Sequence, residues 1–434
     1  MGAVTPPTDL SYSLTEHVLS NGLRVVINPE HHAPVVAVNL WYGVGSRDET
    51  PGRTGLAHLF EHVMFQGSEH VASGEHFDLL QAAGATGNAT TWFDRTNYFE
   101  AVPTGALDLA LWLEADRMGR LLPALTQTNL DTQRDVVKEE KRQRYDNAPY
   151  GDTLERLLPL AFPADHPYGH TVIGSMADLD AASLEDAHEF FRRWYSPANA
   201  VLTLSGDVDP EGALPLIERY FGPLEAAHHP QRVSPASLPP LSGVPRDTAS
   251  GAVPAAQLYL QWRTPPRQHP DADAVDLALS ILGGSETSRL YRRLVRDADL
   301  ASTAGAGAVP LAVGNSLSHV FARAREGVAL EHLEEVALDE VQRLADQGPT
   351  AAELHRAQVQ FEREWLTDAS RVESRADLLS GLVMLDGDPR RLNTRVTQIA
   401  ALDASAVQEA ARAWLAPQAR AVLEYRPATK EATA

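Results

Sequence analysis

Two stretches of this chain, separated by half of its length, repeat the same pattern of residues. The sequence LEDAHEFFRRWYSPANAVLTL, which ends at Leu204, resembles AVQEAARAWLAPQARAVLEY, which ends at Tyr425. Aligning Trp194 with Trp414 gives an offset of 220 residues (414 minus 194) in a chain of 434. In both copies a predicted helix ends at the tryptophan, a proline follows three residues later, and an apolar β-run comes next. The repetition predicts an internal duplication, and therefore two homologous domains.

Each predicted domain mixes strands with amphipathic helices, so the expected fold class is α+β. Runs rich in β-branched and aromatic residues predict strands at 35–42, 97–102 and 258–262. A helical pattern at 271–282 ends at the pair Gly283-Gly284.

The two domains are expected to be joined by a proline-rich linker. Five prolines up to Pro245 predict an extended segment over 228–250. We therefore expect an N-terminal domain over 1–227 and a C-terminal domain over 251–434.

The composition excludes several functions. A formal net charge of -21 argues against nucleic acid or an anionic membrane as partner. The chain has no cysteine, so it can form neither disulfides nor thiolate metal ligands. It contains no apolar run long enough to span a membrane, and its first residues lack the pattern of a secretory signal, so a cytoplasmic location is expected.

The sequence HLFEH concentrates metal-binding chemistry in one helical turn. His58 and His62 are four residues apart, and Glu61 is three residues after His58, so all three lie on one face of a helix. Glycines near both ends predict a short helix over 54–66, with an apolar side that packs into the protein. Two imidazoles and a carboxylate are costly to bury without a ligand, although polar core residues are the alternative interpretation.

A catalytic zinc site needs a third protein ligand and one open position for water. A second predicted helix, over 129–145, offers Glu139 and Glu140. With Val136 and its neighbouring apolar residues taken as the inward side, at about 100° per residue, Glu140 points inward and Glu139 outward. Glu140 is therefore the predicted third ligand.

HLFEH followed by QRDVVKEEKRQRYDNAPYG resembles the pitrilysin family of zinc metallopeptidases, the inverzincins, which include the mitochondrial processing peptidases. The resemblance spans nearly all of the chain and implies two homologous α+β domains that enclose a cleft or chamber. In the family the third ligand is the last carboxylate of the pattern E-R-x-V-V-x-x-E, which here is Glu140. The leading glutamate of that pattern is Gln133 in this chain, a change that is expected to loosen the metal site.

The resemblance and the ligand types imply a peptidase with one Zn²⁺ per chain. Zinc held by His58, His62 and Glu140 would acidify its bound water, and Glu61 would accept the proton of that water as general base. A non-catalytic scaffold and a structural zinc protein are the alternatives.

Substrate peptides are expected to bind by adding a strand to a sheet edge. The sequence GNATTWF resembles the family's substrate-pairing strand, with Asn88 and Ala89 opposite the peptide backbone. An ordinary strand with Asn88 in a turn is the alternative.

The second half departs from complete family members, which place an Arg and a Tyr seven residues apart to assist the substrate carbonyl. Here the segment reads VRDADLASTAG, in which Arg296 is retained, one residue is deleted, and Ser302 stands where the tyrosine is expected. Some family members are heterodimers in which a metal-free subunit carries the Arg/Tyr pair. This chain resembles the zinc-bearing subunit, so a homologous metal-free partner is expected, with a homodimer as the alternative.

Overall fold

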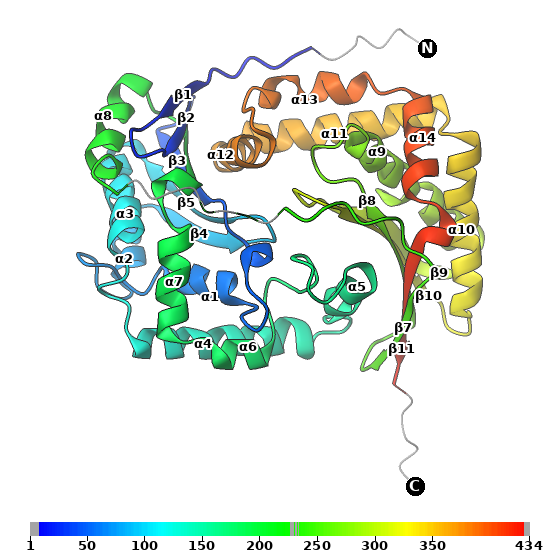
Figure 1. Ribbon diagram of the computed structural model, residues 1–434. Helices are drawn as coiled ribbons and strands as arrows, with labels where there is room; N and C mark the ends of the chain where they lie inside the picture. Colours follow the sequence, from blue (N-terminus) through cyan, green and yellow to red (C-terminus); the bar gives the residue numbers. More distant parts are fainter. Residues whose placement is uncertain (1–7, 226–229, 231, 233, 429–434) are drawn as a thin grey trace.

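The computed structural model describes residues 8–225, 230, 232 and 234–428. Two β-sheets, one from each half of the chain, face each other across the molecule (Figure 1). The first sheet consists of β1 (Thr15–Val18), β2 (Arg24–Pro29), β3 (Val35–Tyr42), β4 (Thr86–Thr91), β5 (Thr96–Pro103) and β6 (Ala200–Gly206). The second consists of β7 (Arg246–Gly251), β8 (Gln257–Thr264), β9 (Ala301–Val309), β10 (Ser316–Ala324) and β11 (Arg420–Pro427).

The two sheets share one topology. The strand order is β1-β2-β6-β3-β5-β4 in the first sheet and β7-β11-β8-β10-β9 in the second. Without β1 the two orders correspond strand by strand, and the one parallel pair, β2 with β6, has β7 with β11 as its counterpart. The predicted duplication into two homologous α+β halves is thus confirmed.

Helices cover both sheets. The helices of the first half are α1 (Leu56–Val63), α2 (Glu75–Ala82), α3 (Leu107–Arg120), α4 (Gln127–Lys141), α5 (Thr153–Ala161), α6 (Met176–Ala181), α7 (Leu184–Trp194) and α8 (Pro210–Phe221). Those of the second half are α9 (Ala272–Gly283), α10 (Leu330–Gln347), α11 (Ala351–Ser370), α12 (Val372–Gly381), α13 (Arg391–Ala400) and α14 (Ala404–Trp414). Short 3₁₀ turns occur at Ser46–Asp48, Thr104–Ala106, Pro197–Asn199 and Pro417–Ala419, and π-helical turns at Arg142–Asp146, Tyr291–Asp297 and Leu382–Asp386.

The predicted elements agree with the observed ones to within a few residues. The helices α7 and α14 end at the aligned tryptophans, and β3 has the predicted bounds. The predicted helix 129–145 is α4 followed by a π-helical turn. Part of the predicted linker, at 228, 229, 231 and 233, lies outside the described residues, as does its boundary with the first domain. The strand β7 already begins at Arg246, inside the predicted linker, because it pairs with β11.

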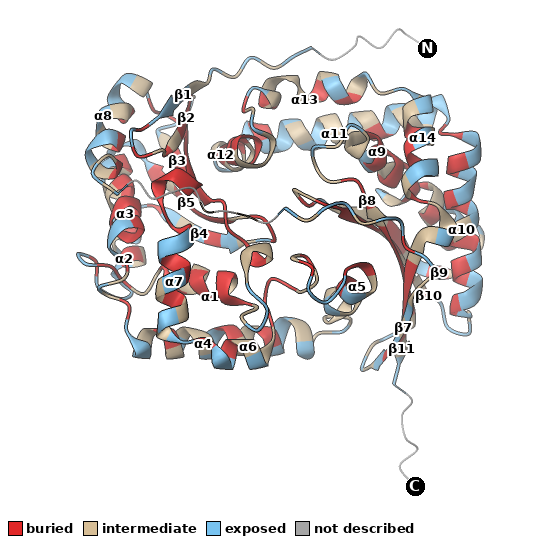
Figure 2. Cartoon of the chain, in the orientation of Figure 1, coloured by how far each residue is buried: buried red, intermediate tan, exposed pale blue. Residues whose placement is uncertain are grey.

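Each sheet is covered on one face by a helix from the other half. On the first sheet, Trp41 and Val201 pack with Leu379 of α12, and Asp377 of α12 accepts a hydrogen bond from Trp41 Nε1 at 2.9 Å. On the second sheet, Leu423 packs with Leu157 of α5. Figure 2 shows many buried residues in the strands of both sheets and in the helices beside them. This exchange of helices holds the two halves together.

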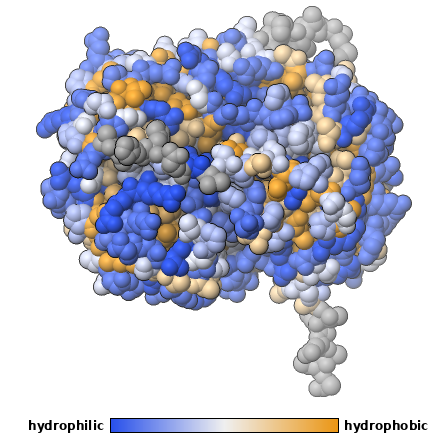
Figure 3. Space-filling model, viewed as in Figure 1, coloured by the Kyte–Doolittle hydropathy of each residue, from blue (hydrophilic) through white to orange (hydrophobic). Residues whose placement is uncertain are grey.

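Charged and polar side chains dominate the face of the protein drawn in Figure 3. Hydrophilic residues cover most of the face drawn in Figure 3, in keeping with the net charge of -21. Among the described residues, no helix combines the length and the apolar character needed to cross a membrane.

Candidate metal centre

The short helix α1 presents its polar side to α4. Leu59, Phe60 and Val63 are fully buried in the core of the first half, which fixes the rotation of the helix. His58 and His62 therefore project together from the opposite side, with their ring centres 5.0 Å apart. One turn of helix thus places both imidazoles side by side on the same face of α1.

The Glu140 side chain approaches both imidazoles from α4. Its Oε2 atom lies 3.7 Å from Nε2 of His58 and 3.5 Å from Nε2 of His62. These separations are longer than hydrogen bonds. They match the roughly 3.4 Å between two ligand atoms of a tetrahedral zinc ion with bonds of about 2.1 Å. On these two separations, Glu140 fits zinc as a co-ligand of each histidine.

The ionisation states of these groups also suit a metal. Burial, reinforced by the neighbouring His62, lowers the pKa of His58 to about 4, so this imidazole is neutral and able to ligate at neutral pH. The nearby His62 lowers the pKa of Glu140, and Arg144 Nη1 donates to Glu140 Oε1 at 2.6 Å. One oxygen of Glu140 is thereby held by Arg144 while the other faces the histidines.

Glu61 lies on α1 beside the two histidines. A ligand atom of Glu61 lies within 4.8 Å of ligand atoms of His58 and His62, so it is an alternative to Glu140 as third ligand. We favour Glu140 because a single oxygen of it faces both Nε2 atoms, whereas Glu61 Oε2 accepts a hydrogen bond from Thr91 Oγ1. Burial raises the pKa of Glu61, although the Thr91 hydrogen bond opposes this. Glu61 is thus placed as a carboxylate beside the site with a raised proton affinity.

The choice of Glu140 over Glu139 was based on the expected buried side of α4, and one residue used to define that side was wrong. Val136, which served as the inward reference, is 45% exposed, whereas Val137 and Leu130 are fully buried. Glu140 nevertheless faces α1, with an 18% exposed side chain. The side chain of Glu139 is 54% exposed and pairs with Arg142 and Gln143.

The predicted substrate-binding residues lie in different halves. Asn88 and Ala89 belong to β4, the outer strand of the first sheet, which continues to Thr91 beside Glu61. Asn88 lies within the strand and not in a turn. Arg296 lies exposed in a π-helical turn of the second half, and no contact in the described part of the chain joins it to the cluster. The single chain therefore gathers the metal-binding candidates but does not bring Arg296 to them.

A second group of metal-ligating residue types is buried between α2, β5 and α3. It comprises His76, Glu100 and Glu114. Both oxygens of Glu114 are bonded to the buried Arg117, and burial raises the pKa of Glu100 well above its usual range. The guanidinium already balances the charge of this group, so we interpret it as a polar core.

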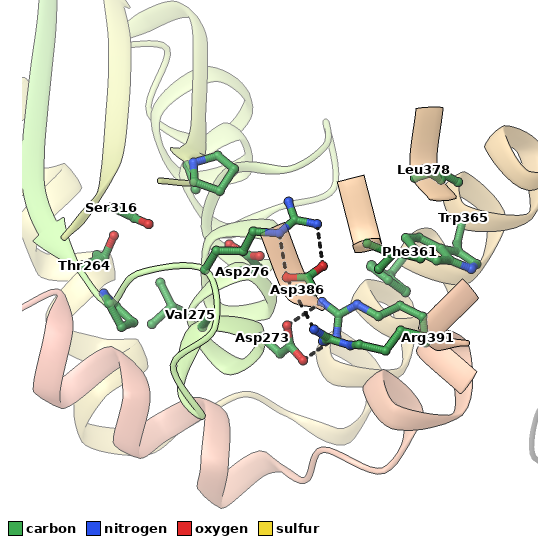
Figure 4. A pocket seen from close by; sticks show the side chains of 17 residues that line it. Thr264, Asp273, Val275, Asp276, Ser316, Phe361, Trp365, Leu378, Asp386 and Arg391 are labelled. Carbon is green, nitrogen blue, oxygen red and sulfur yellow. Dashed lines mark hydrogen bonds and ion pairs between the residues drawn. The ribbon is translucent and has the colours of Figure 1, made fainter. Parts of the chain in front are cut away.

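The cavity shown in Figure 4 lies in the second half and does not border the cluster on α1. It has a volume of about 230 Å³ and is lined from α9, α11 and α13. Its most prominent charges are paired, Asp386 with Arg267 and Asp273 with Arg395. None of the residues of the cluster on α1 lines this cavity.

The fold and the cluster define a duplicated α+β protein with a candidate metal site in its first half. The family model described as insulinase (peptidase family M16) matches residues 24–175, and that described as peptidase M16 inactive domain matches 181–361. A zinc protease, PqqE, of Helicobacter pylori is 31% identical over 366 residues, which cover 83% of this chain and 80% of that protein. The chain belongs to peptidase family M16, the pitrilysin family, as its motifs predicted.

Solved structures agree with this assignment. A protease from Helicobacter pylori superimposes with a TM-score of 0.89 and 27% identity, covering 96% of this chain and all of that one. A peptidase M16 inactive domain from Pseudomonas fluorescens has a TM-score of 0.84 at 19% identity, over 96% of this chain and 98% of that one, and shares the fold.

A second sequence relative, an uncharacterized zinc protease of Mycobacterium leprae, is 32% identical over 64% of this chain and 61% of its own length.

Proposed function

We propose that this protein is a zinc-dependent endopeptidase or oligopeptidase that hydrolyses unstructured peptides. The observation that carries the proposal is the position of one Glu140 oxygen, 3.7 and 3.5 Å from Nε2 of His58 and His62. The relatives named zinc proteases support it. The description of an inactive domain applies to residues 181–361, which contain none of the cluster.

The proposed chemistry assigns a role to each member of the cluster. His58, His62 and Glu140 would hold one zinc ion per chain. Zinc, when bound, supplies a Lewis acid and an acidified water. Glu61 would take up a proton of this water and later deliver it to the leaving amine, a role favoured by the raised pKa of Glu61. The hydroxyl of Thr91 orients the Glu61 carboxylate.

The substrate is proposed to pair with the edge strand β4. This strand leads directly from Asn88 and Ala89 to Thr91, so a peptide added along it would pass Glu61. Main-chain pairing gives affinity with little preference for sequence, which suits unstructured peptides.

We further propose that the chain acts with a homologous, metal-free subunit. Ser302 stands where family members have a tyrosine, and Arg296 has no contact with the cluster in the described part of this chain. A partner would supply the missing Arg/Tyr pair and enclose the chamber, and a homodimer is the alternative. Full specific activity of the purified single chain would contradict the need for a different subunit.

Metal analysis combined with peptide hydrolysis tests the proposed function. We expect one zinc per chain, hydrolysis of an unstructured peptide, loss of activity with a chelator and recovery when zinc is restored. Zinc without hydrolysis, even after a homologous partner is added, would instead indicate a scaffold with a structural metal.

A further inference from the structure

The N-terminus of α1 is capped by a carboxylate from outside the helix. Its N-cap residue, Gly55, has a φ of 88° and no side chain to cap with. The buried Glu49 side chain takes this role, because Oε2 accepts the N–H of Gly55 at 2.9 Å and Oε1 accepts the N–H of Ala57 at 2.7 Å. Ala57 directly precedes His58. Glu49 therefore fixes the backbone immediately before the first histidine.

Glu49 is itself held by a histidine from a distant loop. The Nε2 atom of His170 lies 2.9 Å from Glu49 Oε2 and 2.9 Å from the carbonyl oxygen of Ser46. The Glu49 side chain is fully buried, so it needs a partner of this kind.

The loop that follows His170 presses on the same helix end. A Cβ atom on Gly174 would lie 2.4 Å from the nitrogen of Gly55, so the two backbones are in direct contact. Further along, Asp178 Oδ2 accepts the N–H of Thr54 at 3.0 Å. The start of α1 is thus held from Glu49 on one side and from this loop on the other.

We propose that Glu49 and His170 are positioning residues that set α1 so that His58 and His62 converge with Glu140. This inference rests on the proposed function of that cluster as a metal site. A helix of eight residues has little stability of its own, and its first N–H groups have no partners within the helix. An external carboxylate satisfies two of them and favours the N-terminal end electrostatically. Ligand atoms must lie within about 0.5 Å of their productive positions, so loss of this cap should weaken metal binding.

Zinc affinity of the purified chain, measured by competition with a chromophoric chelator, tests the proposal. The variants are Glu49→Gln, which loses one acceptor and the charge, His170→Ala, and His170→Gln, which restores a donor. Thr350→Ala is the matched control, because Thr350 caps α11 in the half without the cluster. The visible spectrum of the cobalt-substituted protein reports ligand geometry independently of activity. Circular dichroism verifies that each variant is folded.

We expect Glu49→Gln and His170→Ala to bind zinc about 10-fold more weakly and to alter the cobalt spectrum. His170→Gln should recover much of the loss, and Thr350→Ala should melt earlier with unchanged affinity and spectrum. If Glu49→Gln does not fold, His170→Ala decides alone, since it leaves the carboxylate in place. Normal zinc binding by the wild-type chain with unchanged affinity and spectrum in these variants overturns this inference alone. A wild-type chain that binds no zinc overturns the proposed function as well.

Discussion

The Glu61→Gln substitution separates proton transfer from metal binding. Glutamine has nearly the same size as glutamate and keeps an oxygen that can accept the hydrogen bond from Thr91. The three proposed ligands are untouched, because Glu140 reaches the histidines from a different helix. The variant should therefore keep one zinc per chain and lose only the base.

The size of the effect follows from the role assigned to Glu61. A positioned general base contributes a factor of roughly 10²–10⁴ in rate. At about 1.36 kcal/mol for each factor of ten, this loss corresponds to about 3–5 kcal/mol of transition-state stabilisation. Since substrate pairs with β4 in this account, kcat should fall by that factor while KM changes little.

The assay measures steady-state hydrolysis of a fluorogenic unstructured peptide, with zinc content determined on the same samples. Glu139→Gln is the matched control, because the Glu139 side chain is exposed and forms hydrogen bonds only with Arg142 and Gln143 among the described residues. It should retain full activity. A Glu61→Gln variant that carries zinc and still turns over at the wild-type rate would refute the assignment of the base.

Three further substitutions test other parts of the structure. Glu140→Gln should lose zinc at a chelator concentration that leaves the wild-type chain loaded, measured by metal analysis after dialysis. Leu379→Ala, in the helix that covers the first sheet, should lower the free energy of unfolding by about 2–5 kcal/mol in denaturant titration. A decrease of less than about 0.5 kcal/mol, as is usual for surface substitutions, would contradict the packing of α12 on this sheet. Burial raises the pKa of Glu353, but Arg289 and the hydrogen bonds from Thr350 together outweigh burial and bring that pKa to about 2, below the usual 4.5. The ionised carboxylate of Glu353 therefore stabilises the folded chain above pH 4.5, and this contribution should disappear as the pH falls towards 2. The free energy of unfolding is measured against pH for the wild type and Glu353→Gln. Parallel curves over this range would contradict the prediction.

The sequence predicted the duplication because the repeated elements are local. A helix that ends at tryptophan, a proline three residues on and an apolar strand recur at Trp194 and Trp414, and both copies fold as their own residues dictate. The exchange of α5 and α12 between the halves was not predicted, since it joins Leu157 to Leu423 and Trp41 to Leu379 across more than two hundred residues. Side-chain packing between such distant segments leaves no local pattern in the sequence.

The candidate site was predicted where helical periodicity decides the geometry. The spacing of His58 and His62 on one turn is sufficient to bring them together. The prediction that Val136 lies on the buried side of α4 was wrong, because the apolar side of this helix is centred on Val137 and Leu130. Glu49 and His170 were not identified, since a carboxylate that caps a neighbouring helix looks like any other buried or surface acid until the chain is folded.

The proposed metal site is tested most directly by the coordination of zinc in the purified, zinc-loaded protein, determined by X-ray absorption and a crystal structure. We expect one zinc ion bound by Nε2 of His58, Nε2 of His62 and an oxygen of Glu140, each at about 2.0–2.2 Å, with water in the fourth position. Zinc bound by other residues, or a closed site of four protein ligands, would contradict it.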